Sequence, residues 1–172
     1  MPRLTLSNLT VWMPLIMFLV LVDQLMKAWV ISDTSFQSFT EILPGLHLGH
    51  THNTGIAFSM FAELGQHTAK VITLLALAVN LALIAVLCTQ KRSSMSTLYQ
   101  LALTLLISGG LSNLIDRLYY GAVIDFIYLN YHGWHWPTIF NLADVYICIG
   151  CLGLTLCSVK LKARDKMTSV SV

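Results

Sequence analysis

The sequence predicts an all-α membrane protein with four transmembrane helices and a small β-rich segment outside the membrane. The 172 residues are 56% hydrophobic and only 10% charged, and the mean hydropathy is +0.71. A soluble domain of this size is far less apolar. Four apolar runs are long enough to cross a hydrocarbon core of about 30 Å. No flexible linker or internal repeat divides the chain, so we expect residues 1–172 to form one domain.

The four apolar runs are expected to be helices, because a backbone inside lipid must satisfy its own hydrogen bonds. They cover residues 11–31, 69–88, 97–115 and 140–159. The first run resembles the apolar part of a secretory leader. It lasts about 20 residues, however, and no small-residue cleavage site follows it, so we expect it to remain as a helix.

Basic residues predict the orientation of the four helices. Lys91 and Arg92 lie in the short second connection, Arg3 precedes the first run, and four more basic residues follow the last one. Because Lys and Arg favour the cytoplasmic side, we expect both termini in the cytoplasm. The two connections at residues 32–68 and 116–139 then lie outside the membrane.

The first outer connection is expected to supply the β-rich segment. Between residues 36 and 61 it mixes β-branched and aromatic residues with Pro44, Gly45 and Gly49. This pattern is typical of short strands joined by turns. We therefore expect a few strands here, lying on the membrane surface.

A charged pair lies inside the first apolar run. Asp23 and Lys27 are four residues apart, so they share one helical face and can pair. A charge inside a span is costly and is a functional candidate by default. Paired charges are the usual way in which a membrane protein tolerates such groups, so we interpret Asp23 and Lys27 as a structural ion pair.

Further polar residues lie where the third run ends and the fourth begins. Asn113, Asp116 and Arg117 have the spacing i, i+3 and i+4 and should point the same way. Asn141 and Asp144 share one face at the start of the fourth run. In an alternating bundle, these ends and the end of the first run all reach the outer surface. The polar groups are therefore expected to gather in the outer leaflet.

Asp125 follows the third run closely enough to fold back over this cluster and to share a site with Asp144. Two neighbouring carboxyls cannot both ionise easily, so the pair holds one proton. One acid can then act as a base on water while its neighbour polarises a carbonyl group. Such a pair hydrolyses peptides without a metal ion. Spacing alone leaves open that the two are simply solvated acids.

Single features are also compatible with other functions. Cys148 and Cys151 form a C-x-x-C that would suit a thiol oxidoreductase, but their position inside a span favours buried, small apolar side chains. Intramembrane charges could relay protons. The inner halves of the spans offer little polarity beyond Asn80 and Gln100, however, and a pathway needs two open ends. A net charge of +2 without a basic stripe argues against nucleic acid.

An external metal site is a further alternative, because five of the histidines in the outer connections could provide ligands. They are His47, His50, His52, His132 and His135. Their spacing is loose, and no cysteine or paired carboxylate accompanies them. We expect solvated loop histidines and no metal.

Five motifs, in order along the chain, resemble those of one family. They are Asp23–Lys27 (DQLMK), Asn53–Phe58 (NTGIAF), Gly109–Arg117, Val123–Phe126 (VIDF) and Phe140–Asp144 (FNLAD). Together, between residues 14 and 160, they resemble lipoprotein signal peptidase, also called signal peptidase II. The family consists of aspartic intramembrane peptidases.

The resemblance implies an activity and a site. Such an enzyme is an aspartic endopeptidase that cuts a prolipoprotein just before a cysteine that bears a diacylglyceryl group. The family's catalytic aspartates fall on Asp125 and Asp144. Residues at substrate-binding or supporting positions are Asn53, Gly55, Asn113, Arg117, Asn141, Asp23, Lys27 and Asp116. Ser112 stands where the family is expected to have glycine, which should affect only local helix packing.

The resemblance also implies a location and partners. The enzyme would be a multi-pass protein of the bacterial cytoplasmic (inner) membrane, with its active site at the outer leaflet. Its partners would be lipidated precursors and membrane lipid, and it would need no cofactor. We expect a monomer. The segment from Asn53 to Phe58 could form a lid, since Gly55 allows the backbone to approach a ligand; the alternative is a plain turn.

Overall fold

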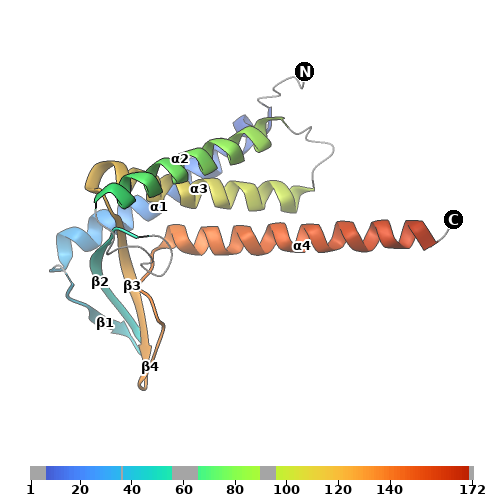
Figure 1. Ribbon diagram of the computed structural model, residues 1–172. Helices are drawn as coiled ribbons and strands as arrows, with labels where there is room; N and C mark the ends of the chain where they lie inside the picture. Colours follow the sequence, from blue (N-terminus) through green and yellow to red (C-terminus); the bar gives the residue numbers. More distant parts are fainter. Residues whose placement is uncertain (1–6, 36, 56–65, 90–95, 171–172) are drawn as a thin grey trace.

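Four long helices and one small sheet make up the computed structural model, which describes residues 7–35, 37–55, 66–89 and 96–170 (Figure 1). The helices are α1 (Ser7–Asp33), α2 (Gln66–Thr89), α3 (Thr97–Tyr120) and α4 (Leu142–Val170). Each contains a stretch long and apolar enough to cross a membrane. In Figure 1 the sheet extends from the end of the bundle where α1 and α3 finish and α4 begins. The predicted fold class is confirmed.

The sheet is antiparallel and combines both outer connections. Its strands are β1 (Thr40–Leu43), β2 (Leu46–Asn53), β3 (Val123–Tyr131) and β4 (Trp134–His135), in the order β1-β2-β3-β4. The two strands of the first connection agree with the prediction. Strands β3 and β4, in the second connection, were not predicted from the sequence. The pairing of β2 with β3 places Asn53 opposite Val123 and Thr51 opposite Asp125, so it brings the two predicted motifs together.

The third helix is longer than predicted. It continues past residue 115 to Tyr120, so Asp116 and Arg117 lie in the helix and not in a connection. Both side chains have partners that compensate for their polarity: Asp116 pairs with a lysine, and Arg117 donates to a backbone carbonyl. The helix ends only at Gly121, whose positive φ of 73° allows its N–H to bond the carbonyl of Arg117.

The fourth helix begins two residues later than predicted, at Leu142, and continues beyond residue 159. Phe140 pairs with Ile127 of β3 instead of entering the helix. Asn141 then caps the helix, because its Oδ1 accepts the N–H of Asp144 at 2.9 Å. In return, Asp144 Oδ2 accepts the N–H of Asn141 at 3.1 Å. This reciprocal arrangement satisfies two N–H groups that the helix itself cannot pair.

Small residues allow α3 and α4 to pack closely. A Cβ atom on Gly109 would lie 2.3 Å from the carbonyl oxygen of Ala143, so only glycine fits there. Gly150 meets α3 in the same way. Because this face of α4 points to α3, Cys148 and Cys151 lie on another face and are exposed. The prediction that both cysteines are buried is wrong.

Candidate active site

Lys27 lies at the centre of a buried polar network between α1 and α3. Its ammonium nitrogen is 2.7 Å from Asp23 Oδ2 and 2.6 Å from Asp116 Oδ2, and it donates to Asn113 Oδ1 at 3.1 Å. All three ammonium donors therefore have an acceptor. A buried charge is tolerated under this condition. The predicted pair of Asp23 and Lys27 is present, and Asp116 extends it to three charges.

Asp23 connects this network to α4. Its Oδ1 accepts the backbone N–H of Ala143 at 3.0 Å, and its Oδ2 accepts the hydroxyl of Ser112 at 2.6 Å. Ala143 lies in the first turn of α4, where N–H groups have no partner within the helix and carry partial positive charge. One carboxylate thus joins α1, α3 and α4 and fixes the start of the fourth helix.

Asp116 connects the same network to the sheet. Its Oδ2 accepts the backbone N–H of Ile124 at 3.2 Å, and its Oδ1 accepts from the Gln24 side chain at 2.8 Å. Ile124 directly precedes Asp125 on β3. The bond from Asp116 therefore fixes the position of Asp125 relative to the helices.

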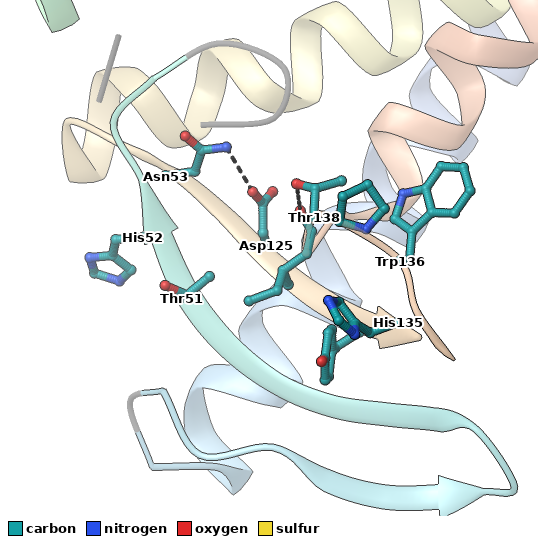
Figure 2. A pocket seen from close by; sticks show the side chains of 10 residues that line it. Thr51, His52, Asn53, Asp125, His135, Trp136 and Thr138 are labelled. Carbon is teal, nitrogen blue, oxygen red and sulfur yellow. Dashed lines mark hydrogen bonds between the residues drawn. The ribbon is translucent and has the colours of Figure 1, made fainter. Parts of the chain in front are cut away.

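Asp125 is buried and is held by two carboxamide groups. Its Oδ1 accepts from Asn141 Nδ2 at 2.7 Å, and its Oδ2 accepts from Asn53 Nδ2 at 2.9 Å; Figure 2 shows the second bond. Burial, and then the nearby charge of Asp144, raise the pKa of Asp125 to about 7. Near neutral pH this carboxyl group therefore exists in both protonation states.

Asn141 is the direct link between the two predicted catalytic acids. Its side-chain nitrogen donates to Asp125, and its side-chain oxygen and backbone N–H take part in the capping bonds with Asp144. On its other side, Asp144 Oδ1 accepts from Asn113 Nδ2 at 3.0 Å. Since Asn113 also accepts from Lys27, the acids and the charged network form one connected cluster.

Arg117 holds the backbone that follows β2. Its Nη2 donates to the carbonyl of Gly55 at 2.7 Å, while Asn53 Oδ1 accepts the N–H of Gly55 at 2.9 Å. Arg117 Nη1 is buried and has no hydrogen-bond partner among the described residues. The rest of the proposed lid, residues 56–58, lies outside the described residues.

Both acids line one cavity of about 660 Å³. Its polar end also contains Asn53, Asn113 and Arg117. Most of the remaining wall is apolar and comes from α2, α3 and α4, within the predicted spans. The site thus combines paired carboxyls with a long apolar surface. This combination suits a ligand with an amide bond next to apolar chains.

The outer histidines make separate local contacts. His50 Nδ1 lies 2.8 Å from Thr34 Oγ1, and His47 packs edge-on against Tyr128. Burial, with a smaller contribution from His52, lowers the pKa of His50. Within the described ranges, no three His, Cys, Asp or Glu residues are grouped so that they could hold a metal ion. The groups that meet at the site are carboxyls, carboxamides and one guanidinium.

Two residues of the network were not predicted to bond within it. Gln24 Nε2 donates to the Ser112 carbonyl and hydroxyl oxygens, at 3.1 and 3.0 Å, as well as to Asp116. Ser112 was expected to affect packing alone, but its hydroxyl donates to Asp23. The sequence feature that could have indicated this role is Gln24 itself, a polar residue next to Asp23 in an apolar run.

Comparison with known proteins agrees with the motifs. The family described as signal peptidase (SPase) II matches residues 15–160. The lipoprotein signal peptidase of Blochmanniella pennsylvanica is 34% identical over 149 residues, covering 84% of this chain and 86% of that protein. The lipoprotein signal peptidase of Actinobacillus succinogenes is 36% identical over 149 residues, covering 87% and 88%.

Two solved structures, both described as a bacterial membrane enzyme studied by the in meso method, have the same fold. One, at 2.3 Å resolution, has a TM-score of 0.77 and 25% identity and covers 90% of this chain and 91% of its own. The other, at 1.9 Å, has a TM-score of 0.72 and 26% identity and covers 93% and 98%. With the family match over most of its length, the chain belongs to the signal peptidase II family.

Proposed function

We propose that this protein is an aspartic endopeptidase that removes the signal peptide from diacylglyceryl-modified prolipoproteins, with Asp125 and Asp144 as its catalytic residues. The observation that supports this most is that both acids line one cavity whose other walls are mostly apolar and come mainly from the membrane-spanning helices. They come from β3 and α4 and are linked by Asn141. Asn53, Asn113 and Arg117, which line the cavity with the acids, bind the substrate or hold the acids in position.

The reaction begins with the proton on Asp125, whose pKa of about 7 keeps it partly protonated. Asp144 takes a proton from water as the oxygen attacks the carbonyl carbon of the scissile bond, and Asp125 gives its proton to the carbonyl oxygen. The resulting diol returns one proton to Asp125. Asp144 then protonates the leaving nitrogen of the cysteine as the C–N bond breaks, so both acids regain their first state.

Two neutral amides and one cation support these steps. Asn53 and Asn141 donate to Asp125, which orients its carboxyl group in the cavity. Arg117 lines the cavity, and its Nη1, a buried donor with no partner in the described part of the chain, would bind a backbone carbonyl of the substrate. The apolar walls accommodate the signal peptide and the acyl chains, for which transfer out of water is favourable.

Cleavage of matched synthetic precursors tests this function. The purified protein should cut a peptide with a diacylglyceryl cysteine just before that cysteine, and the same peptide without the lipid should be cut at least about a hundredfold more slowly, because the acyl chains supply apolar contact area. Strong chelators should leave the rate unchanged, since the acids supply both proton transfers. Equal cleavage of both peptides, or a loss with chelators that zinc restores, would contradict the proposal.

We further propose that the enzyme acts as a monomer in the bacterial cytoplasmic membrane, with both termini in the cytoplasm and the acids at the outer leaflet. One chain supplies every group of the cluster, and the basic residues of the second connection and the C-terminal tail support this orientation. Reporter fusions after Arg92 and at the C-terminus should indicate cytoplasm, and a fusion near Gln66 should indicate the outside. Termini on the outside would place the acids at the wrong leaflet.

A further inference from the structure

A second pocket of about 520 Å³ lies on the sheet beside Asp125 (Figure 2). Its walls come from β2, β3 and residues 135–139. These walls are more polar than those of the first cavity, because they include Thr51, Tyr128 and His135, none of which lines that cavity. We call this pocket the sheet groove.

The sheet groove and the apolar cavity meet at Asp125. The residues that line both are Asn53, Asp125, Trp136, Thr138 and Ile139. Both pockets therefore border the carboxyl group of Asp125. One leads among the membrane-spanning helices, and the other leads over the sheet outside them.

The length of the sheet groove follows from the strand beneath it. The part beyond Asp125 extends along β3 to Tyr128, which is three residues and about 10 Å at about 3.3 Å per residue. Thr51 lies opposite Asp125 in the ladder, and His52 and Asn53 line the end of the groove next to the apolar cavity. An extended peptide advances by the same distance per residue. Beyond Asp125, the sheet groove therefore covers about three residues of bound chain.

We propose that the sheet groove binds the first residues on the carboxyl side of the lipidated cysteine. This inference rests on the proposed function, which places the scissile bond at Asp125. The signal peptide and the acyl chains are apolar and fit the cavity among the helices. The chain that follows the cysteine has a polar backbone that cannot enter lipid without a large loss of hydrogen bonding. The sheet groove offers this segment hydroxyl, imidazole and indole groups.

A series of lipidated peptides tests this inference. All share one signal sequence and differ only after the cysteine, where they carry none, one, two, three, four or six residues. In the wild type, kcat/KM should rise by at least about tenfold from none to three residues, since each added residue can gain a hydrogen bond. It should then stay constant, because the sheet groove ends. The readout is the ratio of kcat/KM for three added residues to that for none.

His135→Asn tests the wall of the sheet groove, and His132→Asn is the matched control. His135 lines the groove, whereas His132 lies in the adjacent turn outside both pockets, at a φ of 49° that asparagine tolerates. The ratio should fall roughly threefold or more in His135→Asn and should match the wild type in His132→Asn. A ratio cancels differences in folded yield between the variants.

Three outcomes would overturn the inference: a wild-type kcat/KM that does not depend on length, a kcat/KM that continues to rise up to six residues, or a ratio in His135→Asn equal to that of the control. If one of these outcomes occurs and the shortest peptide is still cut, only the role of the sheet groove is rejected. The proposed function then remains supported. A series in which no peptide is cut would contradict the proposed function itself, and the inference with it.

Discussion

Asp125→Asn and Asp144→Asn should each reduce cleavage of the lipidated precursor by at least about a thousandfold, because general acid and base catalysis contributes on this scale. Asparagine keeps the size of the side chain but cannot exchange the proton. The two acids act on the same proton transfers, so the double variant should be scarcely slower than either single one. The measurement is kcat/KM on purified protein in detergent or lipid.

Asp33→Asn is the matched control for the two acids. Asp33 is the last residue of α1 and is exposed, so the same substitution there should leave kcat/KM unchanged. Asp116→Asn is less suitable, because Asp116 is completely buried and paired with Lys27. Substantial turnover in either catalytic variant would reject the aspartic mechanism.

The pH dependence provides a second readout for Asp125. Its folded pKa of about 7 lies above the ordinary value of 3.8, so its protonated form is favoured by folding. Wild-type kcat/KM should fall as pH rises through about 7, when Asp125 loses its proton. Stability should be lost at lower pH, between about 4 and 7, as the pH rises from the ordinary pKa to the folded pKa, by an amount on the order of a few kcal/mol. Asp125→Asn should lack this loss, which thermal unfolding at pH 5 and pH 8 would measure.

The sequence was sufficient for the features that depend on length and local spacing. The four spans follow from runs of apolar residues, and the pairing of Asp23 with Lys27 follows from the helical repeat. The approach of Asp125 to the start of the fourth helix followed from topology. Each of these needs only the chain order and a fixed rise per residue.

The sequence alone could not predict features that depend on contacts between residues far apart in the chain. The third helix continues past residue 115 because Asp116 meets Lys27, 89 residues earlier. The fourth helix starts at Leu142 because Phe140 pairs with β3 instead. The cysteines of α4 are exposed because glycines occupy the face that packs against α3. In each case a tertiary contact determines where a helix begins or ends, or which of its faces is exposed.

Lys27→Met should destabilise the protein more than any single change in the acids of the same network. It removes the one cation between Asp23 and Asp116, which are both completely buried. Removing one partner from a buried ion pair costs about 3 to 5 kcal/mol. Asp23→Ala, by contrast, leaves Lys27 with Asp116, so its main effect is to remove the acceptor of Ser112 and Ala143. We therefore expect a smaller loss for Asp23→Ala.

Lys70→Met is the matched control for Lys27→Met, since Lys70 lies on α2 and is exposed. The measurement is the free energy of unfolding or the thermal midpoint in detergent, together with the folded yield. Lys70→Met should stay within about 0.5 kcal/mol of the wild type, as is usual for surface substitutions. Lys27→Met should lower all three quantities, because the network joins α1, α3, the start of α4 and β3 through Asp23 and Asp116. A Lys27→Met variant with wild-type stability and no activity would instead place Lys27 in the chemistry, and its role as a structural support would be rejected.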